Sequence, residues 1–382
     1  AGWLYTEHHD VINEWNGYWK YDRSEKETGL NNIFKGMSLN DLHSGVYISN
    51  QGDITQTVKG NENIEIPIYL SSMTDKDYGE ELYLHYQISH LDYVGIEKEI
   101  NKGVLNIDYF PWMNQSISPL KIKTPKYSGL SKVNFTLKDK EGKIIHRNFM
   151  HLVVKSQFKI PMTSVFSISA NEYSSSKWSK RDWEVLDGLK VNGTGQGFFE
   201  LKIPLPSNLD LTGVKEAYFV IEASSKELYD KDKIKDYSDA GIDYMRGSKI
   251  SPHKNPNSYP MTDEITFSSE INVSVNDKNK MNTVLADDPA DHRGVLSWHN
   301  QIRPAGKVTD KDYWEKKRML NEAGSYGYLV KVPISGKELT ESKQNGFLKI
   351  LFETTGEGGM AIYGKDFGRY PFDPSLVIIT EN

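Results

Sequence analysis

Strict alternation of apolar and polar residues is the feature of this sequence that most constrains its fold. The clearest example is residues 81–89, where every second position is apolar: Leu82, Leu84, Tyr86 and Ile88. The positions between them are Tyr83, His85 and Gln87. Successive side chains of a strand point to opposite faces of a sheet, so a period of two predicts a half-buried strand. Helical periodicity is scarce along the chain, and the sequence therefore predicts a mainly β protein.

Residues 37–156 are expected to form an immunoglobulin-like sandwich. Seven strands are predicted there, at 45–50, 63–71, 81–89, 103–109, 120–124, 132–138 and 144–154. Seven short strands within about 120 residues are typical of such a sandwich. Residues 139–142, Asp-Lys-Glu-Gly, predict a hairpin turn between the last two strands. We expect His85 and His90 to lie at the surface.

Residues 157–382 are expected to form a second and larger sandwich, of the jelly-roll or galactose-binding-like kind. Eight strands are predicted there, at 197–203, 217–223, 264–275, 295–301, 327–334, 347–353, 360–363 and 376–380. The polar stretch 224–263 contains Pro252, Pro256 and Pro260 and is expected to be a long connection. Connections of this length are usually functional or mobile.

Composition narrows the classes of function. The chain has 382 residues, a formal net charge of −6 and no cysteine. This length suits two or three domains, and the absence of cysteine excludes disulfides, thiolate zinc sites and cysteine nucleophiles. No block of basic residues is present, so nucleic acid is not expected as a partner. No apolar run is long enough to span a bilayer, and no membrane association is expected.

The opening segment concentrates polar residues, with Glu7, His8, His9 and Asp10 in four consecutive positions. Imidazole and carboxylate groups together suit zinc or iron. Adjacent residues of a strand point to opposite faces, however, so His8 and His9 cannot easily share one ion. A strand end followed by a polar loop is the simpler interpretation.

The same segment resembles a known enzyme family. The residues that carry the resemblance are Gly2, Tyr5-Thr6, Asp10-Val11, Glu14, Asn16-Gly17 and Tyr21-Asp22-Arg23. This pattern is similar to the last strand of the (β/α)8 barrel, and the loop after it, in glycoside hydrolase family 2. Stretches at 183–188, 193–199, 286–294, 322–330 and 368–371 also resemble that family, although less specifically.

The resemblance implies that residues 1–36 are the end of a catalytic barrel and that Thr6, Glu7 and His8 line its substrate site. Retaining glycosidases use two carboxyl groups about 5 to 5.5 Å apart. In the resembled family these are glutamates on earlier barrel strands, which implies that they lie upstream of this chain. The chain alone is then expected to be inactive, and a secreted or periplasmic location is implied. A non-catalytic carbohydrate-binding or scaffold module is the alternative, and an interaction protein without a sugar ligand is a third.

Two further sets of residues are candidates for binding. Trp298, Tyr326 and Tyr370 are candidates for stacking on sugar rings in the last sandwich, although for each of them singly packing in the core is the simpler interpretation. Asp287, Asp288 and Asp291 place three carboxylates in five positions, which suits a structural calcium ion. Their spacing does not follow the usual calcium-loop pattern, so a loop that caps strands is the other interpretation. No other cofactor is expected.

Overall fold

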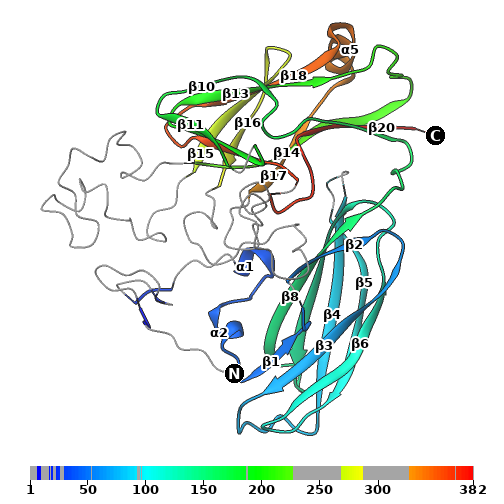
Figure 1. Cartoon of the computed structure of the whole chain (residues 1–382), viewed down its shortest axis with the longest axis vertical. Coiled ribbons are helices and arrows are strands. Elements are labelled where there is room, and N and C mark those ends of the chain that lie inside the picture. Colours follow the sequence, from blue (N-terminus) through cyan, green and yellow to red (C-terminus); the bar gives the residue numbers. More distant parts are fainter. Residues whose placement is uncertain are drawn as a thin grey trace, which may run out of the picture.

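The computed structural model confirms a mainly β protein (Figure 1). It describes residues 30–226, 268–286 and 327–381, apart from positions 53, 93, 94, 96, 186, 187 and 366. It also describes residues 7–9, 17, 19 and 23–25. The described strands form two separate pairs of sheets, one above the other in Figure 1. No helix among the described residues is long and apolar enough to cross a membrane.

The first sandwich consists of a three-stranded and a five-stranded sheet. The three-stranded sheet has the order β1-β3-β6, with β1 Val46–Ser49, β3 Asn63–Ser72 and β6 Asn114–Lys123. The five-stranded sheet has the order β2-β8-β7-β4-β5, with β2 Thr55–Lys59, β8 Ile144–Lys155, β7 Gly129–Lys138, β4 Glu81–Asp92 and β5 Lys98–Asp108. Apolar residues from both sheets form one core, among them Ile48, Leu70, Leu84 and Phe135.

All seven strands predicted for this part of the chain are present, and the structure adds β2. The sequence did not reveal β2, Thr-Gln-Thr-Val-Lys, because it has one apolar residue and pairs in parallel with β8 at the sheet edge. The predicted hairpin turn is confirmed, since the Gly142 N–H donates to the Asp139 carbonyl at 3.0 Å. The prediction that His90 lies at the surface was wrong. It is buried opposite Ser131, whose hydroxyl lies 2.8 Å from His90 Nδ1.

The second sandwich has a five-stranded and a seven-stranded sheet. The five-stranded sheet has the order β10-β13-β18-β15-β16, with β10 Tyr173–Trp178, β13 Gly197–Pro204, β18 Phe347–Thr354, β15 Ser269–Val275 and β16 Lys278–Leu285. The other has the order β11-β12-β19-β14-β20-β9, with β11 Arg181–Val185, β12 Lys190–Thr194, β19 Met360–Tyr363, β14 Val214–Ser224, β20 Ser375–Thr380 and β9 Thr163–Ser167. Its seventh strand, β17 Tyr328–Pro333, pairs with β14. Both sheets contribute to a second core, which includes Phe219, Ile221, Ile350 and Phe352.

Three short helices accompany the described strands. The longest, α5 Gly336–Asn345, begins at a capping box formed by Ser335 and Glu338. It ends at Gly346, which has the left-handed conformation that favours glycine. Leu339 on α5 is buried in the second core. The other two, α1 Leu30–Ile33 and α2 Leu39–Leu42, lie beside the first sandwich, where Leu30 and Ile33 of α1 pack with Phe149 of β8.

The two sandwiches meet where the turn between β4 and β5 approaches β17. A Cβ added to Gly95 in this turn would lie 3.0 Å from the Lys331 side chain of β17. The Lys331 ammonium in turn lies 3.8 Å from the centre of the Tyr218 ring on β14. Glu97, which follows the same turn, pairs with Lys132 of β7 at 2.7 Å and lies in the electrostatic field of Arg369. The junction therefore contains charged side chains from both sandwiches.

Candidate functional site

Most of the residues predicted to bind ligands lie outside the described part of the chain. This applies to Thr6, Trp298 and Tyr326 and to the three aspartates Asp287, Asp288 and Asp291. Their predicted roles stay predictions. The described residues contain no group of three or more His, Asp or Glu side chains that could hold a metal ion.

Glu7 and His8 lie in an irregular part of the chain. The described residues around them form single bridges, between His9 and Trp19 and between Trp19 and Glu25. The Trp19 N–H donates to the His8 carbonyl at 3.3 Å, and the Trp19 and His8 ring centres are 6.3 Å apart. These contacts place His8 beside an aromatic ring. The substrate-lining role of Glu7 and His8 stays a prediction.

Tyr370 is half-buried and belongs to the tightly held turn that precedes β20. Its ring is nearly parallel to that of Phe372, with 6.5 Å between the ring centres. The Arg369 guanidinium lies 5.4 Å from the centre of the Tyr370 ring. Two neighbours thus pack against this side chain within the fold. Stacking of Tyr370 on a sugar stays a prediction.

The backbone of this turn is held by Glu222, a fully buried carboxyl group on β14. Glu222 Oε1 accepts the N–H groups of Gly327 and Arg369, at 2.7 and 2.8 Å, and Oε2 accepts the Tyr370 N–H at 2.9 Å. Burial raises the pKa of Glu222 to about 7, although the three N–H donors and the Arg369 charge favour the ionised form. Glu222 therefore joins three distant segments of the second sandwich.

Two glycines permit this approach. A Cβ at Gly368 would lie 2.2 Å from Glu222 Oε2, and one at Gly327 would lie 2.8 Å from the Tyr363 ring. Both distances are shorter than side-chain atoms tolerate, so each position requires glycine. The Glu222 carboxylate thus brings Gly327 together with Arg369 and Tyr370, which lie far from it in the sequence. Sequence reasoning missed Glu222 itself.

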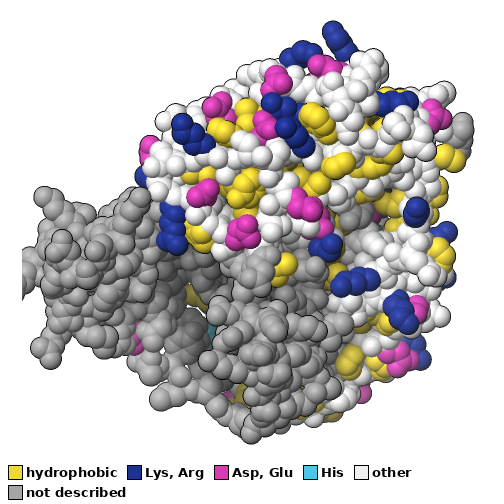
Figure 2. All heavy atoms as spheres, turned by 45° about the horizontal axis from the view of Figure 1, so that its top comes forward, with side chains coloured by type: hydrophobic (Ala, Val, Ile, Leu, Met, Phe, Trp, Pro, Cys, Tyr) yellow, Lys and Arg dark blue, Asp and Glu magenta, His cyan; other side chains and the backbone are white. Residues whose placement is uncertain are grey.

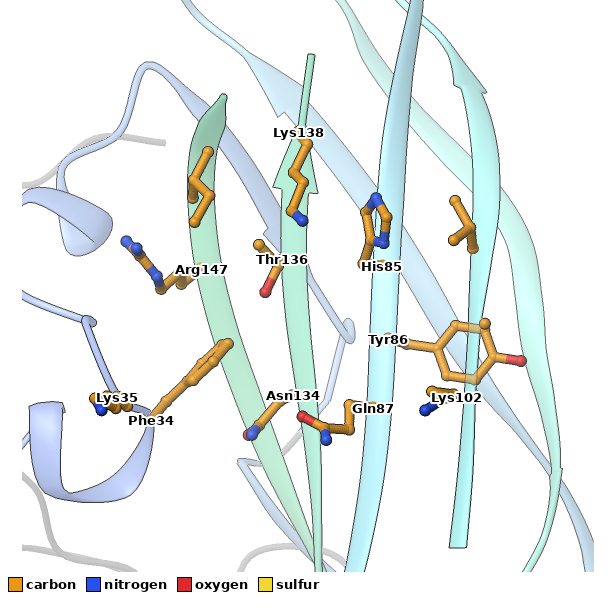
Figure 3. Close-up of a pocket in the computed structure, with 13 residues that line it drawn as sticks. Phe34, Lys35, His85, Tyr86, Gln87, Lys102, Asn134, Thr136, Lys138 and Arg147 are labelled. Carbon is orange, nitrogen blue, oxygen red and sulfur yellow. The ribbon is translucent and has the colours of Figure 1, made fainter. Parts of the chain in front are cut away.

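A shallow groove crosses the outer face of the five-stranded sheet of the first sandwich (Figure 3). Its volume is about 520 Å³, within the range of about 300 to 1,000 Å³ that is common for ligand pockets. The residues that line it are Phe34, Lys35, His85, Tyr86, Gln87, Lys102, Gly103, Val104, Asn134, Thr136, Lys138, Ile144 and Arg147. They come from β5, β4, β7 and β8 and from the segment after α1.

Strand register arranges the floor of the groove in two rows. The first row runs across four strands as Val104, His85, Thr136 and Arg147. The second row places Lys102, Gln87 and Asn134 opposite one another on three strands. With strands about 4.8 Å apart, the rows extend over roughly 10 to 14 Å. Figure 3 shows the labelled side chains of the two rows on the same face of the sheet.

Among the described residues, the groove is lined only by basic and neutral side chains. Its cationic groups are Lys35, Lys102, Lys138 and Arg147. His85 lies among them, and its pKa is lowered by burial and by the nearby charge of Lys138. Neutral donors and acceptors from Gln87, Asn134 and Thr136 occupy the floor, and Phe34 lies at one side (Figure 3). Such a lining can form hydrogen bonds with a polar ligand and attract negative charge.

Two of the four cations already have carboxylate partners. Lys102 lies 2.7 Å from Glu99, which also accepts a hydrogen bond from Gln87 at 2.7 Å. Arg147 lies 3.7 Å from Asp41 of α2. Within the part of the chain that the structure describes, no acidic side chain forms an ion pair with Lys35 or Lys138. These two ammonium groups are the ones available to a ligand.

Comparisons with known proteins do not identify a family. No protein-family model matches the chain, and no curated protein matches it. Among solved structures, it is similar to an alkylpurine DNA glycosylase, AlkC, of Pseudomonas fluorescens bound to DNA with an abasic site analogue. That similarity covers 28% of this chain and 30% of the other, with 14% identity and a TM-score of 0.20. A likeness this weak carries no argument about fold or function.

Proposed function

We propose that this chain is the C-terminal, accessory part of a glycoside hydrolase resembling family 2, and that it binds carbohydrate through the groove of the first sandwich. In this proposal the first sandwich is immunoglobulin-like and the second is jelly-roll or galactose-binding-like. Residues 1–36 complete a catalytic barrel whose two glutamates lie upstream. The reaction is hydrolysis of a β-glycosidic bond with retention, in a secreted or periplasmic enzyme.

The groove is the observation that carries the binding part of this proposal. Sugars present many hydroxyl groups, and Gln87, Asn134 and Thr136 offer amide and hydroxyl partners along one open face. Phe34 adds an aromatic side chain at the edge of the same surface. An open groove of this kind can accept part of a long chain without enclosing its ends.

A second role, as a scaffold that braces the barrel, is favoured by the junction between the sandwiches. Charged side chains from both sandwiches meet there, with Glu97 of the first sandwich in the field of Arg369 of the second. Within the second sandwich, Glu222 also holds the start of β17 and the turn before β20 against β14. The two roles are compatible, since one accessory region can both brace a barrel and hold substrate.

Binding is tested by titrating the complete chain with neutral and acidic β-linked oligosaccharides of equal length in a calorimeter. Saturable binding to at least one of them is expected, and no binding to any of them would refute the binding role. Catalysis is tested with the longer polypeptide that includes the upstream region. Hydrolysis with retention, followed by proton NMR of the anomeric signals, is expected. Inversion, or hydrolysis by the present chain alone, would overturn the catalytic part of the proposal.

A further inference from the structure

The charge of the groove differs from that of the rest of the molecule. The chain has a formal net charge of −6, yet the described residues that line the groove include four cationic side chains and no acidic one. On the second sandwich, Figure 2 shows basic and acidic side chains interspersed. There Lys349 contacts both Glu200 and Asp277, and Lys280 contacts Glu338, within 3.0 Å. Lys35 and Lys138 have no carboxylate partner among the described residues, so their positive charge is a local feature of the groove.

The cations lie around the edge of the groove, and neutral groups lie between them. Lys138 and Lys102 are at opposite ends in Figure 3, while Lys35 and Arg147 are on the side next to the α1 segment. His85, Thr136, Asn134 and Gln87 occupy the surface between these groups. A fitting ligand has separated negative charges joined by neutral groups that form hydrogen bonds.

We propose that the groove selects carbohydrate with carboxylate or sulfate groups, and that Lys35 and Lys138 contact these anionic groups. This inference rests on the proposed carbohydrate-binding function and specifies its ligand. Carboxylate and sulfate are both oxyanions, so an ammonium group attracts either in the same way. Uronic acids carry carboxylates and sulfated sugars carry sulfates. Both also have hydroxyl groups that can form hydrogen bonds with Gln87, Asn134 and Thr136.

Single-stranded nucleic acid also has separated negative charges, but the groove is less suited to it. Proteins that bind single strands stack successive bases on aromatic side chains. The floor of this groove has amide, hydroxyl and imidazole groups, and Phe34 and Tyr86 belong to opposite sides of it. An acidic carbohydrate needs hydrogen bonds along the floor and no series of aromatic platforms.

The test compares three oligosaccharides of equal length, one neutral, one with carboxylates and one with sulfates. Calorimetric affinities are measured for the complete chain and for K35Q, K138Q and the double variant. The matched control is K121Q, because Lys121 is an exposed lysine on β6 in the other sheet of the same sandwich. Inorganic sulfate and a single-stranded oligonucleotide serve as competitors.

At low salt, we expect at least one acidic oligosaccharide to bind roughly 10-fold more tightly than the neutral one. Each lysine substitution is expected to lower its affinity up to about 5-fold, as for exposed ion pairs. The lysine substitutions should not change the affinity for the neutral oligosaccharide. K121Q should bind all three oligosaccharides with the same affinity as the unchanged chain. Raising the ionic strength from about 0.01 to about 0.1 M shortens the screening length from about 30 to about 10 Å and should remove most of the preference.

Four outcomes would overturn the inference. Equal binding of neutral and acidic sugars would refute the selectivity and leave the proposed carbohydrate binding intact, whereas no binding of any sugar would refute the proposed function itself. If K35Q and K138Q bind the acidic oligosaccharide as tightly as the unchanged chain does, the anionic groups of the ligand do not contact Lys35 and Lys138. Displacement of the acidic sugar by inorganic sulfate or by the oligonucleotide at equal or lower concentration would identify a different class of ligand.

Discussion

The buried carboxyl group of Glu222 makes the stability of the second sandwich depend on pH. Its pKa is raised to about 7 in the folded chain, from an ordinary value of 4.5. Between these two pH values the folded chain holds a proton that the unfolded chain has released. The free energy of unfolding therefore falls as pH rises through this window, and the loss is complete above about pH 7.

The size of this effect follows from the two pKa values. Each pH unit between them changes the free energy of unfolding by about 1.4 kcal/mol, so the window accounts for about 3 kcal/mol. Glu222→Gln removes the ionisable group and with it this dependence. The variant also places an NH2 group against a backbone N–H, which costs about 1 to 3 kcal/mol at every pH.

The assay is urea denaturation of wild type and Glu222→Gln from pH 4.5 to pH 8, with the transitions of the two sandwiches fitted separately. Near pH 4.5 the variant is expected to be the less stable protein. Between pH 4.5 and pH 8, the free energy of unfolding of the wild type should fall by about 3 kcal/mol relative to that of the variant. Glu353→Gln, at an exposed position of β18, is the matched control and should follow wild type throughout. Parallel curves for wild type and Glu222→Gln would refute the reasoning.

Three other substitutions test the packing described above. Gly368→Ala places a Cβ against Glu222 and is expected to destabilise the second sandwich by about 1 to 3 kcal/mol. Gly356→Ala is the control, because Gly356 has open space around it, and it should leave the stability unchanged. Thermal denaturation of both variants checks this. Leu84→Ala leaves a cavity in the first core and should lower the stability of the first sandwich by about 2 to 5 kcal/mol while the second transition stays in place, as differential scanning calorimetry will show. Ser335→Ala removes the cap of α5 and is expected to cost about 1 kcal/mol in the second transition; a loss above 3 kcal/mol in urea denaturation would contradict a simple capping role.

Alternation in the sequence predicted the strands that bury one face, because burial acts on every second residue. It placed His85 and Gln87 on the outer side of β4, where the structure also places them. It could not show that Lys102 lies opposite Gln87, or that Thr136 and Arg147 continue the row from His85. Those pairs depend on strand register, which brings together residues up to about 60 positions apart.

Other elements left weaker signals. The strands β9 to β12 have five or six residues each and are mostly polar in sequence, so no clear alternation of apolar residues marks them, even though β12 is buried along its whole length. The helix α5 has a recognisable signal in the capping-box sequence Ser335-Gly336-Lys337-Glu338, but Leu339 is its one apolar residue, so it has no helical periodicity. Glu222 had none of its own, since its three N–H donors come from residues 105 to 148 positions later. The glycines Gly327 and Gly368 were the traceable sign of a close backbone approach.

If carbohydrate occupies the groove on the outer face of the five-stranded sheet, a bulky side chain on the floor of the groove will block binding. Thr136 lies near the middle of its floor, so Thr136→Trp should fill the groove without disturbing the core (Figure 3). Ser116→Trp puts the same side chain at an exposed position of β6 in the other sheet and serves as the control. The account predicts that, in calorimetric titration with the tightest-binding oligosaccharide, Thr136→Trp binds at least about 10-fold more weakly while Ser116→Trp matches wild type. Equal binding by all three proteins, each shown to be folded by circular dichroism, would contradict it.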